Sequence, residues 1–154
     1  MIVFVLRHAD RKPEPDDELT ATGRERADRL ARMLEESGVS AAFRTEFVRA
    51  RQTLEPLERA RGGALRVNII RSKDVPTSTH VQRVVQAVQS QPADAVVAVV
   101  GHSDTVGGIV EGLLDGRLVE PIRIGADEFD RLFILFIDPP RPATLLRLRY
   151  GGPT

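Results

Sequence analysis

The sequence contains no cysteine, which excludes every structural and chemical role of a thiol. A chain without cysteine can form neither disulfides nor a thiolate metal site, and it has no thiolate nucleophile. Lysine is almost missing as well, since Lys12 and Lys73 are the two lysines among 22 basic residues. The remaining basic residues are arginines, whose planar fork of donors suits phosphate groups. The composition therefore permits phosphate recognition and excludes redox chemistry through sulfur.

Net charge and long apolar runs are also absent. The 22 basic residues balance 22 acidic ones, so the usual electrostatic argument for a nucleic-acid partner fails. No apolar run approaches the roughly 20 residues that cross a bilayer. The apolar residues 2–6 are too short for the core of a signal peptide and lead directly into Arg7. We therefore expect a cytoplasmic protein that binds neither nucleic acid nor membrane.

The length of 154 residues and the hydrophobic share of 42% are sufficient for a hydrophobic core without disulfides or metals. The sequence shows no internal repeat, linker or low-complexity segment. We expect a single domain that spans residues 1–154.

Alternating strand and helix patterns run along the chain. Continuous apolar runs at 2–6 and 95–100 are typical of strands covered on both faces. Further strands are predicted at 41–45, 65–70, 132–137 and 144–150, the last two joined by a proline-rich turn. Apolar residues at helical spacing predict four intervening helices, around 27–34, 50–57, 81–88 and 106–114. Thr22 and Glu25 have the spacing of a capping box at the start of the first helix.

This alternation predicts an α/β protein. The expected architecture is a three-layer α/β/α sandwich, with a mostly parallel mixed sheet of about six strands and a C-terminal hairpin.

The residues with the most useful chemistry follow predicted strands. Arg7 and His8 leave the first strand, His102 follows Gly101 after the strand at 95–100, and Arg49 lies in the first turn after the strand near 41–45. In open α/β sheets, ligands bind beyond the carboxyl ends of the strands. We therefore expect these side chains to meet at one edge of the sheet.

Two imidazoles and two guanidinium groups form a set that suits phosphoryl transfer. The reaction needs a nucleophile in line with the leaving oxygen and positive donors around the other phosphate oxygens. One imidazole can be the nucleophile, and a second, protonated imidazole with two guanidinium groups can supply the donors without a metal.

Four motifs, in this order, resemble those of the histidine phosphatase superfamily, the phosphoglycerate-mutase-like group. They are Leu6-Arg7-His8-Ala9-Asp10, Leu19-Thr20-Ala21-Thr22-Gly23, Arg49-Ala50-Arg51-Gln52-Thr53 and Val100-Gly101-His102-Ser103. With the closing strand pair, the resemblance covers essentially the whole chain. Its compact length is similar to that of the short bacterial members of phosphohistidine-phosphatase type.

The resemblance implies a role for each matching residue. His8 matches the residue that becomes phosphorylated, Arg7 and Arg49 match the phosphate clamps, and His102 matches the second histidine of the pocket. The implied function is a metal-independent, histidine-type acid phosphatase that needs no cofactor. It would hydrolyse phosphomonoesters or phosphohistidine through a phosphohistidine intermediate on His8. Its substrate would be a phosphorylated small molecule or a phosphoprotein.

The acid that protonates the leaving group is not obvious in the sequence. Family members that act on alkyl phosphates usually supply a glutamate after the third strand, whereas here Asp74 is the nearest carboxylate. Asp74 is thus a candidate for this acid, and its alternative role is that of an ordinary loop or helix-start carboxylate.

Three other functions compete with the phosphatase. A phosphoglycerate-mutase-like phosphotransferase must exclude water, and the chain has no insertion long enough to cover its substrate. A non-catalytic phosphate-binding module would keep the pocket without turnover. A metal-dependent hydrolase would use as ligands His8, Asp10, His80 and His102. Neighbouring arginines would oppose a divalent cation, and we expect His80 to be a surface or helix-cap residue.

Overall fold

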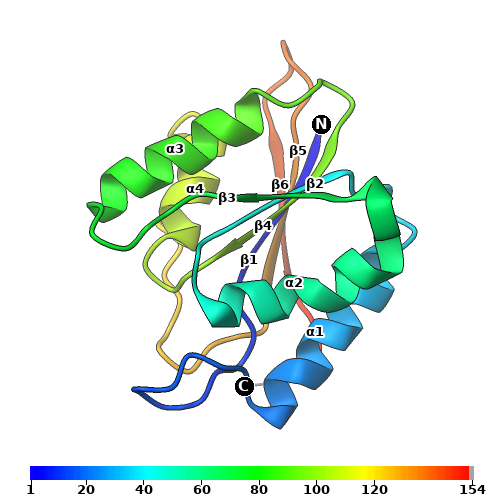
Figure 1. Cartoon of the computed structure of the whole chain (residues 1–154). Coiled ribbons are helices and arrows are strands. Elements are labelled where there is room, and N and C mark those ends of the chain that lie inside the picture. The colour runs from blue at the N-terminus through cyan, green and yellow to red at the C-terminus, as the bar shows by residue number, and fades with distance from the viewer. Residues whose placement is uncertain (153–154) are drawn as a thin grey trace.

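The computed structural model describes residues 1–152 and shows one mixed sheet with helices on both faces (Figure 1). Its strands are β1 (Ile2–Arg7), β2 (Ala41–Arg44), β3 (Arg66–Ile69), β4 (Val96–Gly101), β5 (Arg131–Phe136) and β6 (Thr144–Arg149). Its helices are α1 (Ala21–Leu34), α2 (Val48–Arg61), α3 (Thr77–Gln89) and α4 (Val106–Leu113), and a short 3-10 turn, η1, covers Gly62–Ala64. Each predicted strand is present within one residue at either end.

The strand order across residues 1–152 is β3-β2-β4-β1-β5-β6. The first four of these strands run parallel, and β5 is antiparallel to both β1 and β6. The expected three-layer α/β/α architecture with a C-terminal hairpin is therefore confirmed. Because β1, β2 and β4 are parallel neighbours, their carboxyl ends lie at the same edge of the sheet.

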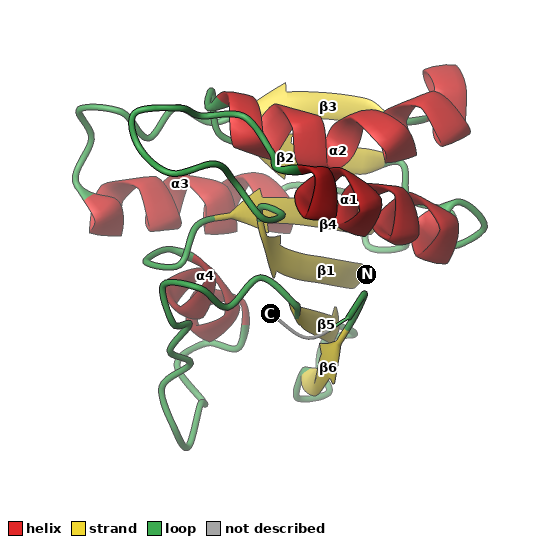
Figure 2. Ribbon diagram, turned by 90° about the horizontal axis from the view of Figure 1, so that it is seen from below, coloured by secondary structure: helices red, strands yellow, loops and turns green. Residues whose placement is uncertain are grey.

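Strand β4 shows why the core has two halves. Val97 and Val99 point into a cluster with α3 and α4, whereas Ala98 and Val100 point into a cluster with α1 and α2. Figure 2 shows α1 and α2 together on one side of β4, away from α4. A strand covered on both faces has no polar alternation, as its sequence indicated. Each fully buried aliphatic side chain contributes about 1.5–3 kcal/mol relative to exposure.

Helix α1 begins two residues earlier than the capping-box pattern predicted. Its N-cap is Thr20, whose hydroxyl accepts a hydrogen bond from the amide of Gly23 at 3.0 Å. Thr22, the predicted cap, lies inside the helix, so that prediction is wrong. The tertiary structure decides the choice, because the amide of Thr20 donates to the carbonyl of Asp10 at 2.9 Å and holds the chain in an extended conformation there.

Helices α3 and α4 pack closely because glycines of α4 face valines of α3. A Cβ atom added to Gly112 would lie 2.8 Å from a methyl group of Val85, and one added to Gly108 would lie 3.3 Å from Val81. Val84 and Val88 are buried in the same cluster. The valine-rich segment is therefore a helix stabilised by packing, as its spacing indicated. Of the helices within residues 1–152, none is both long and apolar enough to cross a membrane.

We predict that Gly23→Ala destabilises the protein by about 1–3 kcal/mol, because the new methyl group would overlap backbone atoms. An added Cβ would lie 2.0 Å from the carbonyl oxygen of Asp10. Urea denaturation measures the change in the free energy of unfolding. Gly63→Ala is the control, since nothing lies within 4 Å of its added Cβ. Equal stability of the two variants would contradict the close approach of α1 to Asp10.

Candidate active site

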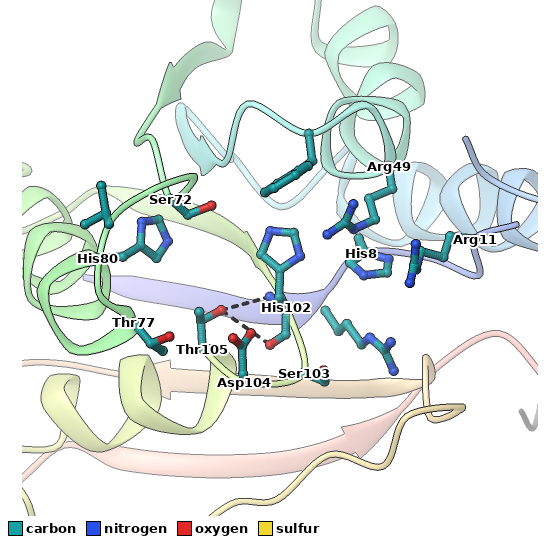
Figure 3. Close-up of a pocket in the computed structure, with 13 residues that line it drawn as sticks. His8, Arg11, Arg49, Ser72, Thr77, His80, His102, Ser103, Asp104 and Thr105 are labelled. Carbon is teal, nitrogen blue, oxygen red and sulfur yellow. Dashed lines mark hydrogen bonds between the residues drawn. The ribbon is translucent and has the colours of Figure 1, made fainter. Parts of the chain in front are cut away.

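A cavity of about 440 Å³ lies at the carboxyl edge of the sheet (Figure 3). The four predicted site residues, Arg7, His8, Arg49 and His102, all line it. They come from the end of β1, the start of α2 and the loop after β4. The ring centroids of His8 and His102 are 5.3 Å apart. The predicted convergence of these residues from distant parts of the chain is thus present in the structure.

The environment of His8 leaves one ring nitrogen free to react. Its Nδ1 atom lies 2.8 Å from the carbonyl oxygen of Ala9. Because a carbonyl can only accept, Nδ1 carries the hydrogen and the lone pair of the neutral ring resides on Nε2. Burial, with smaller contributions from the nearby His102 and Arg7, lowers the pKa of His8 to about 2. At neutral pH the imidazole is therefore uncharged and nucleophilic at Nε2.

A threonine of α2 connects the His8 loop to the Arg49 turn. The amide of Ala9 donates to Oγ1 of Thr53 at 2.9 Å, and this hydroxyl donates to the carbonyl of Arg49 at 2.7 Å. Both Ala9 and Thr53 are fully buried. The two motifs are therefore joined directly, so the positions of His8 and Arg49 depend on each other.

Arg7 is fixed by a segment that sequence reasoning did not connect with the site. Its Nη1 atom donates to the carbonyls of Gly125, Ala126 and Glu128, at 3.0, 2.7 and 3.0 Å. Its guanidinium carbon lies 4.0 Å from the centre of the Phe129 ring. Burial, followed by repulsion from Arg11, lowers the pKa of Arg7 to about 10, so the group is still charged at neutral pH.

Arg49 is held by a carboxylate and an aromatic ring. Its Nη1 donates to Asp17, whose carboxylate also accepts from the amide of Val48 at 2.7 Å. Its guanidinium carbon lies 4.2 Å from the centre of the Phe47 ring. The Nε atoms of Arg49 and Arg7 are buried without a hydrogen-bond partner in the described part of the chain. An unpaired buried donor costs about 1–3 kcal/mol, so each of these two arginines lowers the free energy of unfolding through its unpaired Nε.

His102 differs from expectation in its charge. Its Nε2 lies 2.8 Å from the hydroxyl of Thr45. Burial lowers its pKa to about 4, with Arg49 adding to the effect and Asp104 opposing it. The ring is therefore neutral at pH 7 in this structure, whereas the predicted role as a phosphate donor used a protonated ring. A bound anion would favour the protonated form, because it brings negative charge next to the ring.

Gly101 has a steric role beside His102. A Cβ atom at this position would lie 2.9 Å from Oγ1 of Thr105 and 3.1 Å from a methyl group of Val106. The same Thr105 hydroxyl accepts from the amide of His102 at 2.9 Å. Glycine therefore permits the close turn from β4 into α4 that positions His102.

His80 also lines the cavity, and its burial corrects the prediction of a surface or cap residue. Its side chain is 2% exposed and its Nδ1 lies 3.2 Å from the carbonyl of Arg71. The spacing of His80, Val84 and Val88 places all three on one face of α3, and that face packs inward. This helical register was the signal in the sequence that could have placed the histidine inside.

Two carboxylates considered from the sequence have other positions. Asp74 is exposed with φ 62° and is not among the residues that line the cavity, so the structure does not support it as the leaving-group acid. Asp10 accepts from Nε of the buried Arg26 at 2.6 Å. Over residues 1–152, no group of three or more His, Asp or Glu side chains is arranged to hold a metal.

We predict that His8 and His102 both remain neutral when the pH is lowered from 7 to 5, because their pKa values are about 2 and about 4. Nitrogen NMR shifts of the imidazoles measure this and should show His8 with hydrogen on Nδ1. The unfolded chain binds more protons below the ordinary pKa of about 6.5, so these residues make the folded state less stable as pH falls from there. Titration of His8 near pH 6.5 would contradict the buried, neutral site.

The comparisons with known proteins agree with this geometry. The family model described as histidine phosphatase superfamily (branch 1) matches residues 4–72, which include Arg7, His8 and Arg49. No curated protein sequence matches the chain significantly.

Solved structures share the fold over nearly the whole chain. The protein histidine phosphatase SixA, complexed with tungstate, has a TM-score of 0.69 at 20% identity, and 97% of each chain is covered. The alpha-ribazole phosphatase from Shigella flexneri has a TM-score of 0.70 at 18% identity, covering 100% of this chain and 98% of the other. A mycobacterial glucosyl-3-phosphoglycerate phosphatase has a TM-score of 0.66 at 16% identity, with 99% of both chains covered.

Proposed function

We propose that the chain, which the histidine phosphatase family model matches over residues 4–72, is a member of that superfamily and hydrolyses phosphomonoesters or phosphohistidine through a phosphohistidine intermediate on His8. The observation that carries the proposal is the neutral His8 ring, whose Nδ1 hydrogen is bound to Ala9 while Nε2 remains available beside two arginines. A nucleophile and positive donors in one cavity are what phosphoryl transfer requires.

In the first step, Nε2 of His8 attacks phosphorus and a P–N bond forms. The bond from phosphorus to the leaving oxygen breaks, and that oxygen keeps the electron pair. Arg7, Arg49 and His102 bind the other phosphate oxygens, where negative charge is spread in the transition state. Because Arg7 and Arg49 are fixed by carbonyl and carboxylate partners, little reorganisation is needed when the phosphate enters.

In the second step, water attacks the phosphohistidine and releases inorganic phosphate. Phosphatase chemistry is favoured over mutase chemistry by two short connections at this edge of the sheet. The chain passes from β2 to α2 and from β4 to α4 within a few residues, so neither connection can enclose the substrate. Water therefore reaches the phosphoenzyme before a second phosphate acceptor is trapped there.

The substrate we propose is a phosphorylated small molecule or a phosphoprotein. This proposal is supported by the names of the similar structures, which are a protein histidine phosphatase, a glucosyl-3-phosphoglycerate phosphatase and an alpha-ribazole phosphatase. The donors of the site act without a metal, because two guanidinium groups already supply the positive charge.

Hydrolysis of 4-nitrophenyl phosphate in the presence of a chelator tests this function. We expect turnover to be unaffected by the chelator and an acid-labile phosphoenzyme to be trapped after rapid quenching. His8→Ala should remove the trapped species while circular dichroism shows a folded chain. Loss of activity with the chelator would indicate a metal enzyme instead, and phosphate binding without any turnover would indicate a binding module.

We predict that Arg49→Lys lowers kcat/KM by about 10²–10³, because lysine keeps the charge but loses the forked donor geometry. The matched control is Arg51→Lys in the same helix. Arg51 is exposed and pairs with Glu55, so its replacement should leave kcat/KM near the wild-type value. Near-native turnover of the Arg49 variant would count against its role as a phosphate clamp.

A further inference from the structure

The reaction proposed above leaves one chemical need unassigned. An alcohol oxygen that departs from phosphorus carries negative charge and must receive a proton if the alcohol is a poor leaving group. Arg7, Arg49 and His102 face the phosphate in the proposal, and His8 is the nucleophile. The remaining histidine of the chain, His80, lines the same cavity.

The reactive atom of His80 is directed by its neighbour. Nδ1 lies 3.2 Å from the carbonyl of Arg71 and therefore carries a hydrogen. Within residues 1–152, Nε2 has no hydrogen-bond partner. Nε2 is not fully buried, and His80 lines the cavity, so Nε2 is accessible from the cavity. His80 can thus exchange a proton at Nε2 while Nδ1 stays fixed.

The loop that carries Arg71 is attached to the rest of the site. The carboxylate of Glu46 accepts hydrogen bonds from the amides of Ser72, at 3.0 and 3.3 Å, and Lys73, at 2.7 Å. Burial raises the pKa of Glu46, but these amides outweigh it and lower the pKa, which favours the ionised carboxylate. Glu46 directly follows Thr45, whose hydroxyl contacts His102. His80 and His102 are therefore positioned by adjacent residues of the same loop.

The arrangement of the three imidazoles fits an in-line reaction. Figure 3 shows His8 and His80 on opposite sides of His102. In a displacement at phosphorus, the leaving oxygen departs on the side opposite the nucleophile. His80 therefore lies on the side where the leaving group of a phosphate held by Arg49 and His102 would depart.

We propose that His80 is the general acid for the leaving oxygen and the general base for the attacking water. This inference rests on the proposed phosphatase function and extends it to phosphate esters of poor leaving groups. The site would then accept aryl and alkyl phosphomonoesters that are not chemically activated.

The proton balance closes over the two steps. In the first, protonated His80 gives its Nε2 proton to the departing oxygen as the P–O bond breaks and the P–N bond to His8 forms. In the second, neutral His80 takes a proton from water as the water oxygen bonds to phosphorus. The P–N bond breaks, its electron pair returns to Nε2 of His8, and His80 is protonated for the next turnover.

Comparing two esters of different leaving group tests the proposal. In His80→Gln, kcat/KM for phenyl phosphate should fall by about 10²–10⁴, which is the usual contribution of a general acid. The value for 4-nitrophenyl phosphate should change far less, because nitrophenolate departs without a proton. His80→Asn, which keeps an amide donor for the Arg71 carbonyl, should show the same selective loss. Circular dichroism and thermal unfolding verify that both variants fold.

Two matched controls use carboxylates near the site. Asp74→Asn suits the left-handed backbone at that position and should leave the ratio between the two esters at its wild-type value. Asp104→Asn changes an exposed carboxylate that lines the cavity, and it should affect both esters by the same factor.

Several results would overturn the proposal. An equal loss on both esters in the His80 variants would indicate a structural role, and no loss on either would remove His80 from the reaction. A selective loss in Asp104→Asn instead would assign the acid there. If neither His80 variant folds, the two esters are compared on the wild-type protein. A kcat/KM about 10²–10⁴ lower for phenyl phosphate than for 4-nitrophenyl phosphate would mean that no acid protonates the leaving oxygen, and it would overturn the proposal.

The failure of this inference is distinct from failure of the phosphatase function. If His80→Gln still forms the phosphoenzyme on His8 from 4-nitrophenyl phosphate but shows the wild-type ratio between esters, the inference about His80 alone fails. If the wild-type protein forms no phosphoenzyme from either ester, the proposed function itself fails.

Discussion

The pairing of β1 with β4 is the constraint on which the site depends. Arg7 is opposite Gly101 in this parallel ladder, and the amide of His8 donates to the Gly101 carbonyl at 2.9 Å. This hydrogen bond is formed just where both strands end, so the next residue of each chain segment, His8 and His102, emerges at the same edge. The register of two central strands, buried on both faces, therefore determines the separation of the two imidazoles. A shift by one residue would send one of them to the opposite face of the sheet.

Burial gives these residues their chemistry as well as their position. Desolvation makes both imidazoles neutral, and the nearby arginines act in the same direction. The two guanidinium groups are fixed in place, because backbone carbonyls hold Arg7 and the carboxylate of Asp17 holds Arg49. The cavity therefore combines a neutral nucleophile with fixed positive charge. An anion that enters it meets stronger electrostatic interactions than in water, since the surroundings have a lower dielectric constant.

Local sequence patterns correctly predicted the helices and strands that do not depend on a distant contact. The apolar runs predicted β1 and β4, and the stripe of Ala50, Leu54 and Leu57 predicted α2. Where a distant contact intervenes, local reasoning failed. The cap of α1 is Thr20 rather than Thr22, because the carbonyl of Asp10 holds the backbone of Thr20. The lowered pKa of His102 also could not be inferred from a local pattern, since it follows from burial in the folded chain.

The sequence by itself determined the order of strands and helices and the presence of Arg7, His8, Arg49 and His102 after strand ends. These follow from periodicity and from the general rule that parallel strands present their carboxyl ends together. Only the tertiary structure decided that the carbonyls of residues 125–128 hold Arg7, that Asp17 holds Arg49 and that His80 faces the cavity. The physical reason is that the contacts of Arg7 and Arg49 join residues from 32 to 121 positions apart, and no local sequence pattern shows which distant residues packing will bring together.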